Sequence, residues 1–431
     1  MKRYRRSLVA TTTAASLLAV AGACSGSDNT AGDDDSPVDL TMTVWTADEE
    51  VIGTYETMAE EFREIDPRLG SLTVQSIPFD NYLGRLTTQL SGGDAPDLGW
   101  LVEANIPALA EAGALVDVGD ALHDFEGYDF DDIVPGTLTG VEREDGLFGY
   151  PFASTTHPII VNTDLFAAAG VDSPVELFER GEWTWENLAR VSRELVQSGA
   201  AAYGFDIPQF QYSQYTQMTP FLKAFGAEAW PEGTQCGYDS PEAVEAVEFI
   251  RTMAFVDDSF PAPGETSSFP TGDTGMYLGP PSTLNNLTDA GFAFDLVPQP
   301  EGSAGFDPFF GQAAVVAFSS GDDIDVASDF LAYISTTESS RRLMKFFIPP
   351  RASLLTPELV SESNPMISPA AAQRSLIDTL DTAEQLSFPL AIPELESAIR
   401  PVMDGLWQPE ADVAAVLAEV CDVAEPILES Q

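Results

Sequence analysis

Lysine is nearly absent from this sequence, whose 431 residues include only Lys2, Lys223 and Lys345. Lys and Arg together number 19 against 69 Asp and Glu, which gives a formal net charge of −50. A surface of this sign repels nucleic acid and anionic lipid, so both are poor partners for the chain. Acidic surfaces stay hydrated at high salt, where screening removes their self-repulsion. The composition therefore favours a source in a salty or alkaline habitat.

Signatures of metal and nucleophilic chemistry are also scarce. His123 and His157 are the only histidines, and neither a His-x-x-Glu-His nor a Cys-x-x-Cys spacing occurs. The sequence has no Gly-x-Ser-x-Gly elbow and no P-loop either. We therefore expect no metal, no cofactor and no catalytic role.

Beyond the first 24 residues, no segment of the sequence has the run of about eighteen apolar residues that a membrane span needs. The chain opens instead with a basic start and an apolar stretch through Leu17 and Val20, and small residues precede Cys24. This pattern predicts a signal peptide over 1–23, resembles a lipoprotein processing site at Cys24, and is followed by a polar, flexible tether over 24–37. Arg5-Arg6 also resembles a twin-arginine signal, so the export route stays open. We expect a lipid-anchored protein on the extracellular face of the membrane or in the periplasm.

If Cys24 carries lipid, Cys236 and Cys421 remain as an even pair in an oxidising compartment. A disulfide between them is one interpretation. Two buried thiols are the other, because free cysteine packs as a small hydrophobe.

The folded part alternates strand and helix patterns. Leu40, Met42 and Val44 predict a strand, and a helical stripe from Val51 to Ile65 follows. Further along, residues 72–77 predict a strand, 82–90 a helix, and a third strand begins near Asp97. This order implies parallel βαβ units.

The pattern restarts in the second half. Residues 159–161 predict a strand, Thr184 is the expected N-cap of a helix that ends at Gly199, and Ser240 is the expected N-cap of another. Residues 327–334 predict one more helix. We interpret the chain as two α/β lobes with a ligand cleft between them.

Six short motifs occur in an order and spacing that resemble the family 1 extracellular solute-binding proteins, the group of maltose-binding protein. They are Val44-Trp45, Ser91–Asp97, Ala110–Leu115, Gly149–Pro151 with Val161–Phe166, Trp183–Glu186 and Tyr203–Phe205. The resemblance implies an α/β type II periplasmic-binding fold whose two lobes are joined by a three-crossing hinge. It places the first lobe at 38–153 plus 312–358 and the second at 154–311 plus 359–431. It further implies a monomeric carrier that delivers a sugar to the membrane subunits of an ABC permease.

A sugar site needs planar aromatics for the C–H faces and polar side chains for the hydroxyl edge. Trp45 ends the first strand, where ligands of parallel sheets bind. Packing in the core is its alternative role. Near the end of the third strand, the resemblance places Asp97, Trp100 and Glu103 at the cleft.

The crossover between Pro151 and Asn162 has the spacing of maltose-binding protein, where it supplies a ligand carboxylate. Here that stretch carries Thr155, Thr156 and His157 instead, so hydroxyls or the imidazole would serve.

The remaining candidates lie in the second half of the chain. Residues 209–217 mix amide and aromatic side chains, and we expect Gln211, Tyr212 and Tyr215 to bind the ligand. The alternative is that this segment is only a polar surface helix or loop. Phe310 and Gln312 sit where the family crosses back, and Arg351 matches a late Pro-x-Arg segment, with a salt bridge as its alternative role. The tryptophan that commonly stacks on sugar in this family is replaced by Pro281, which leaves the identity of the solute open.

Two other functions remain. A secreted glycosidase needs only two carboxylates, which this acidic chain could supply. A carrier for a polyamine would want a carboxylate-lined aromatic box, and one for glycerol phosphate would want basic residues, which are scarce.

Overall fold

A computed structural model describes residues 36–207, 210–265, 267–306, 308–321, 323–380 and 382–430. The expected signal peptide, Cys24 and all of the expected tether except Ser36 and Pro37 lie outside these residues. The elements below belong to the unit Pro37–Gln431.

A six-stranded sheet organises the first lobe. Its order is β12-β11-β3-β1-β2, and β6 pairs with β11. The pairs β1–β2 and β1–β3 are parallel, as the βαβ pattern predicts, whereas β11 runs antiparallel to β3 and β6. The strands are β1 (Val38–Val44), β2 (Leu69–Ser76), β3 (Leu98–Val102), β6 (Tyr150–Thr156), β11 (Phe309–Ala317) and β12 (Glu384–Gln385).

A four-stranded sheet of order β10-β7-β9-β8 organises the second lobe. Its strands are β7 (Ile159–Asn162), β8 (Tyr203–Asp206), β9 (Thr274–Leu278) and β10 (Phe294–Val297). Because side chains alternate across a strand, Ile159 and Val161 enter one apolar core while Ile160 enters another on the opposite face. A separate hairpin pairs β4 (Glu142–Arg143) with β5 (Gly146–Leu147).

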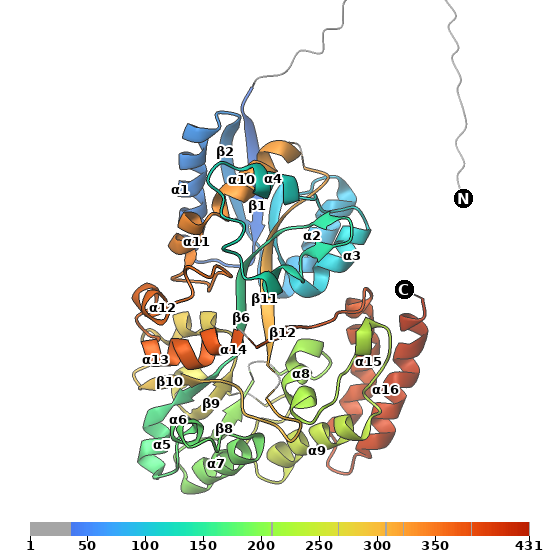
Figure 1. Ribbon diagram of the computed structural model, residues 1–431. Helices are drawn as coiled ribbons and strands as arrows, with labels where there is room; N and C mark the ends of the chain where they lie inside the picture. The colour runs from blue at the N-terminus through green and yellow to red at the C-terminus, as the bar shows by residue number, and fades with distance from the viewer. Residues whose placement is uncertain are drawn as a thin grey trace, which may run out of the picture. The chain divides into compact units, whose positions relative to one another are not determined.

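The helices cover both sheets (Figure 1). In the first lobe they are α1 (Glu49–Ile65), α2 (Phe79–Gly92), α3 (Ile106–Glu111), α4 (Gly119–Asp124), α10 (Ile324–Ile334) and α11 (Thr337–Leu343). Around the second sheet they are α5 (Thr163–Ala169), α6 (Pro174–Glu179), α7 (Trp185–Ser198), α8 (Tyr215–Ala224), α9 (Pro241–Phe255), α12 (Pro357–Ser363), α13 (Pro369–Ala372), α14 (Asp378–Leu380), α15 (Ile392–Met403) and α16 (Val413–Leu428).

The helix boundaries follow local chemistry. The Thr184 side chain accepts a hydrogen bond from the backbone N–H of Asn187 and caps α7, which ends at Ser198 and is followed by Gly199 with φ of 76°. Ser240 caps α9 in the same way. These caps confirm the expected starts of both helices, because the side-chain oxygens satisfy amides that a helix leaves unpaired.

Three strands join the lobes. β6 leads from the first sheet into β7, β11 returns to the first sheet, and β12 lies beside β11 on the way to α15 (Figure 1). The α/β fold with a three-crossing hinge is therefore confirmed. The exact lobe boundaries stay predictions. Met344, Ile348 and Leu354, in the expected first-lobe segment, pack in a core with Ile160 of the second sheet.

Cys236 and Cys421 are joined by a disulfide that ties the loop before α9 to α16. Among the helices that the structure describes, none is long and apolar enough to cross a membrane.

Candidate ligand-binding cleft

A cavity of about 790 Å³ lies between the two lobes. Its first-lobe side is lined by residues that follow β1 and β3, by the start of α2, by β6 and by the segment Met344–Ile348. Its second-lobe side is lined by the loop into α8, the turn after β9 and the start of α15. A volume in this range fits a drug-sized or oligosaccharide ligand. Trp45 and Glu103 follow the ends of the parallel strands β1 and β3 and line this cavity, as the strand pattern predicts for Trp45 and the resemblance implies for Glu103.

The first-lobe side is aromatic. We call the following lining residues the aromatic wall: Trp45, Phe79, Tyr82, Phe152, Phe346 and Phe347. The Trp45 ring meets Phe79 edge-on at 5.7 Å and Tyr82 at 5.3 Å between centroids. Trp100 lies behind the wall and contacts the rings of Trp45, Phe152 and Phe347 at 5.0, 4.8 and 5.5 Å. These contacts make one continuous aromatic cluster, of which Phe79 is 59% exposed.

The second-lobe side carries amides. We call Gln211, Gln214, Gln217 and Asn364 the amide wall. The backbone N–H of Gln211 donates to Oε1 of Gln217 at 2.6 Å, and Nε2 of Gln217 donates to Oε1 of Gln214 at 3.0 Å. These bonds hold the Gln214 and Gln217 amides in one orientation. A pre-oriented amide loses less entropy when it binds a hydroxyl.

Two carboxyl groups face the cavity from opposite lobes. Burial raises the pKa of Glu103 to about 7, although its Oε2 accepts a hydrogen bond from the backbone N–H of Gln312 at 2.9 Å. Burial likewise raises the pKa of Glu396 to about 7, and its Oε1 accepts from the N–H of Tyr215 at 3.0 Å. Near neutral pH each carboxyl can therefore accept or donate a hydrogen bond.

Cations are few in the cleft. Among the described residues that line it, Lys345 is the only lysine or arginine, and its Nζ lies 2.6 Å from a carboxylate oxygen of Glu50. Burial lowers the pKa of His157 to about 4, so this imidazole is neutral at pH 7. An anionic ligand would find little to neutralise its charge here.

The cavity brings together six of the residues predicted from the sequence. They are Trp45, Glu103, Thr155, His157, Gln211 and Gln312. Gln312 turns its side chain away, since Nε2 donates to the carbonyl of Thr137 at 2.7 Å and to Oγ of Ser154 at 2.9 Å. Its backbone N–H instead orients Glu103. Contact between these residues and a ligand stays a prediction.

Three other predicted residues do not line the cavity. Asp97 accepts hydrogen bonds at Oδ2 from the backbone N–H of Thr41 at 2.7 Å and its hydroxyl at 3.0 Å, which ties β3 to β1. Trp100 is fully buried behind the aromatic wall. The Thr156 hydroxyl pairs with that of Thr379 at 2.7 Å inside the hinge.

The same holds for three aromatic residues. Tyr212 donates its hydroxyl to the carboxylate of Asp404 outside the cavity. The Tyr215 ring is buried against Phe388, with 5.5 Å between centroids. Phe310 is also buried, and its neighbour Phe309 lines the cavity instead, because successive side chains of β11 point to opposite faces.

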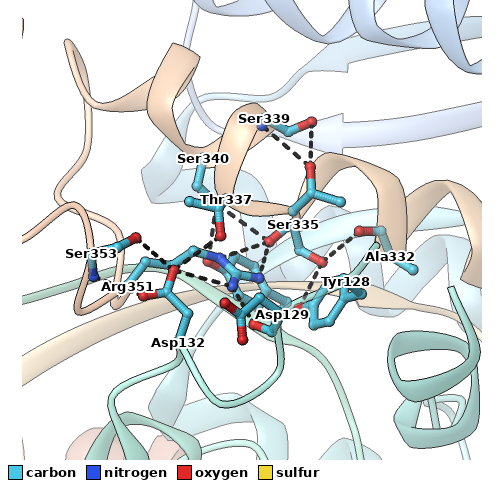
Figure 2. A network of polar contacts seen from close by, with 12 residues as sticks. Tyr128, Asp129, Asp132, Ala332, Ser335, Thr337, Ser339, Ser340, Arg351 and Ser353 are labelled. Carbon is cyan, nitrogen blue, oxygen red and sulfur yellow. Dashed lines mark hydrogen bonds and ion pairs between the residues drawn. The ribbon is translucent and has the colours of Figure 1, made fainter. Parts of the chain in front are cut away.

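Arg351 is fully buried in the first lobe and does not reach the cavity either. Its guanidinium donates to the carbonyl oxygens of Asp129 and Ser335 and lies 3.6 Å from a carboxylate oxygen of Asp132 (Figure 2). The carbon of the guanidinium sits 4.9 Å from the ring centre of Tyr128. The alternative role, a salt bridge to acid, is the one that the structure describes.

Asp132 extends this network. Its carboxylate accepts hydrogen bonds from the backbone N–H and hydroxyl of Ser353 at 2.7 and 2.8 Å and from the hydroxyl of Thr337 at 3.0 Å (Figure 2). Arg351 follows closely after Met344–Ile348, all of which line the cleft. The network therefore fixes the chain four residues beyond Phe347 of the aromatic wall and is positioned to anchor that segment.

Residues 49–340 match the sequence model of the bacterial extracellular solute-binding proteins. The chain belongs to this family. An extracellular or periplasmic location follows from the membership. No match is found among curated protein sequences.

Solved structures with the same fold include solute-binding proteins of several bacteria. An ABC substrate-binding protein from Listeria monocytogenes in complex with cycloalternan is 18% identical, with a TM-score of 0.79 over 91% of this chain and 99% of that one. A solute-binding protein from Thermotoga lettingae bound to α-D-tagatose is 19% identical, with a TM-score of 0.76 over 90% and 99%. UgpB from Mycobacterium tuberculosis in complex with glycerophosphocholine is 18% identical, with a TM-score of 0.75 over 92% and 99%.

Gln214 and Gln217 line the cavity and belong to the segment 209–217, whose composition pointed to the cleft. Other lining residues of this solute-binding protein escaped the sequence analysis. Phe79 begins α2 three residues after β2 ends, and this position beyond a strand end was a usable signal. Phe347 and Glu396 reach the cavity only through tertiary packing, and no local pattern marks them.

Proposed function

We propose that the chain is the substrate-binding component of an ABC importer that captures a sugar or oligosaccharide outside the cell. The observation that carries this proposal is a cavity with an aromatic wall on one lobe and an amide wall on the other. A sugar presents weakly apolar C–H faces and a hydroxyl edge, and the two walls complement those two surfaces. The Listeria and Thermotoga proteins of the same fold hold cycloalternan and tagatose.

Capture would proceed by closure of the lobes about the hinge strands β6, β11 and β12. A ligand that contacts both walls stabilises the closed state, because it interacts more strongly with that state than with the open one. A membrane permease would then receive the closed form. Neither step requires catalysis, and the proposed protein is not an enzyme.

We further propose that Cys24 carries the lipid that holds the protein at the membrane. Small residues before this cysteine and the polar stretch after it support the assignment. Expression of the full chain and of Cys24→Ser, followed by detergent phase partitioning, tests it. The wild type is expected in the detergent phase and the variant in the aqueous phase. If both proteins partition in the same way, Cys24 does not carry a lipid anchor.

The lining of the cleft bears on two alternative functions, a carrier for a phosphate-bearing solute and a glycosidase. A phosphate-bearing solute is disfavoured because Lys345 is engaged by Glu50. A glycosidase reaction would need one protonated and one ionised carboxyl group, and Glu103 and Glu396 are the lining glutamates that could supply them. The carboxyl pair therefore has to be tested for turnover.

The experiment is a thermal-shift screen in high salt against sugars, oligosaccharides, polyamines and glycerol phosphates, because a ligand specific for the folded state raises the melting temperature. Hits are titrated by calorimetry and incubated for days with product analysis. Saccharide binding without turnover is the expected result. Hydrolysis would favour the glycosidase, and a response confined to polyamines or phosphates would overturn the sugar assignment.

A further inference from the structure

The two walls of the cleft differ more than a sugar alone requires. Asp80, Asn105 and Thr155 are accessible on the first-lobe side, but a larger group of accessible side chains there has no carbonyl or hydroxyl oxygens: Trp45, Phe79, Leu83, Val102 and Phe347. The accessible side chains on the second-lobe side include the amides of Gln211, Gln214 and Gln217. A hydroxyl placed against the first group would lose its hydrogen bond to water without replacement, at a cost of roughly 1–3 kcal/mol.

The orientation of the rings limits what a sugar can cover. The planes of Trp45 and Phe79 meet at 80°, so one flat pyranose face can stack on only one of them. Phe79 is 59% exposed, and its ring is left over when a sugar stacks on Trp45. An exposed phenylalanine beside a half-buried tryptophan, inside a cavity, has a second apolar group as its natural complement.

Charge narrows the ligand further. Asp80, Glu103 and Glu396 line the cavity, whereas the cation of Lys345 is paired with Glu50. A carboxylate or phosphate on the ligand would meet acidic groups on both lobes. The apolar group and the polar part are therefore both expected without negative charge.

We propose that the ligand is an amphiphile without negative charge, a saccharide whose hydroxyls face the amide wall and whose separate aryl or alkyl group lies against Phe79 on the aromatic wall. This inference rests on the proposed sugar-binding function and specifies the class of sugar derivative. Glycosides with an apolar aglycone have the required chemistry.

Matched glycosides test the proposal. Calorimetry compares the methyl and phenyl glycosides of the sugar that the thermal-shift screen identifies. The phenyl glycoside is expected to bind at least about ten-fold more tightly, since it buries a ring that the methyl glycoside lacks. Equal affinity, or weaker binding of the phenyl glycoside, would overturn the proposal and leave sugar binding intact.

Variants separate the two walls. Phe79→Ala is expected to abolish most of the phenyl advantage, measured as the ratio of the phenyl to the methyl glycoside affinity within the same variant. Gln214→Ala is expected to weaken both glycosides by the same factor. Phe178→Ala removes a phenylalanine that is 37% exposed on α6, away from the cavity, and is the matched control with no expected effect. An unchanged phenyl advantage in Phe79→Ala would contradict the placement.

A probe without a sugar makes the test independent of the screen. N-phenyl-1-naphthylamine is neutral and fluoresces in apolar sites. The native chain is expected to bind it at one site, with several-fold weaker binding in Phe79→Ala and unchanged binding in Phe178→Ala. If the wild type does not bind the probe, the proposed apolar subsite is wrong. Probe binding together with a screen that finds no saccharide would instead refute the sugar function and retain the subsite.

Discussion

Trp45 contacts three other aromatic rings and still exposes part of its own ring to the cleft. We predict that Trp45→Ala weakens ligand affinity by ten-fold or more, which corresponds to about 1.4 kcal/mol, because the stacking surface is lost. Calorimetry with the identified ligand measures this change. Phe306→Ala, at a ring that is 42% exposed but outside the cavity, is the control. Unchanged affinity in Trp45→Ala would remove this residue from the site.

Glu103 predicts a pH dependence of stability. Burial raises the pKa of its carboxyl from 4.5 to about 7, so the folded chain holds the proton more tightly than the unfolded chain does. The protonated form therefore contributes stability that is fully present below about pH 4.5 and is lost as pH rises through about 7, on the order of 3 kcal/mol in total.

Glu103→Gln keeps an acceptor for the N–H of Gln312 but cannot lose a proton. We predict that the free energy of unfolding of the variant, relative to wild type, increases from pH 5 to pH 8. Denaturant titrations at several pH values measure the difference. A constant difference across this range would show that Glu103 is not buried as described.

At the residue scale, the sequence was informative where a side chain is placed by its own strand. Trp45 and Glu103 follow β1 and β3, and strand ends of parallel sheets converge. Trp100 and Phe310 were misplaced because a one-residue step along a strand turns a side chain to the other face. The sequence position alone did not show which side chains of the strand point to the cleft.

The anchor of the segment Met344–Ile348 is a feature of several elements at once. Arg351 is fully buried, and its removal would leave Asp132 without its cation. We predict that Arg351→Leu destabilises the protein by about 3–5 kcal/mol, the range for breaking a buried pair. Denaturant unfolding measures the loss.

Ligand affinity should fall in the same variant although Arg351 does not line the cavity, because Phe346 and Phe347 lose their support. Arg190→Leu is the control, since the Arg190–Glu194 pair is partly exposed and contributes at most about 1 kcal/mol. A destabilised Arg351→Leu protein with unchanged affinity, measured well below its melting temperature, would contradict the anchoring role.

Elements with local signals were predicted closely. The N-caps of α7 and α9 and the apolar faces of α1 and α2 depend on residues that are close together in the sequence. Other features depend on contacts between residues far apart in the sequence. They are the pairing of β12 with β11, the packing of Met344 and Ile348 against Ile160, and the approach of α15 to the cleft. No local periodicity encodes such contacts.

At the scale of the whole molecule, charge governs stability. With a net charge of −50, the folded chain repels itself at low ionic strength. Screening shortens the reach of this repulsion from about 10 Å at 0.1 M salt to about 3 Å at 1 M. We predict that the melting temperature rises by several degrees between these concentrations of KCl.

Differential scanning calorimetry measures the rise. Chloride is the suitable anion, because sulfate stabilises most proteins by exclusion from their surfaces. A melting temperature that stays flat or falls with KCl would contradict the role of self-repulsion. The fold itself was predictable at this scale, since ordered motifs spread over the chain constrain the topology more than any single one does.

The position of Lys345 has a practical consequence for such measurements. Once the expected signal peptide is removed, Lys223 and Lys345 are the remaining lysines, and Lys345 is exposed at the cleft. Amine-reactive dyes and amine coupling to a sensor surface would therefore modify few sites, and Lys345 beside the ligand is one of them. A chain immobilised through Lys345 would have its cleft held against the support and would give falsely weak affinities. In a Lys223→Arg variant, Lys345 would be the remaining lysine of the folded part and could carry a reporter dye that senses the lobes as they close.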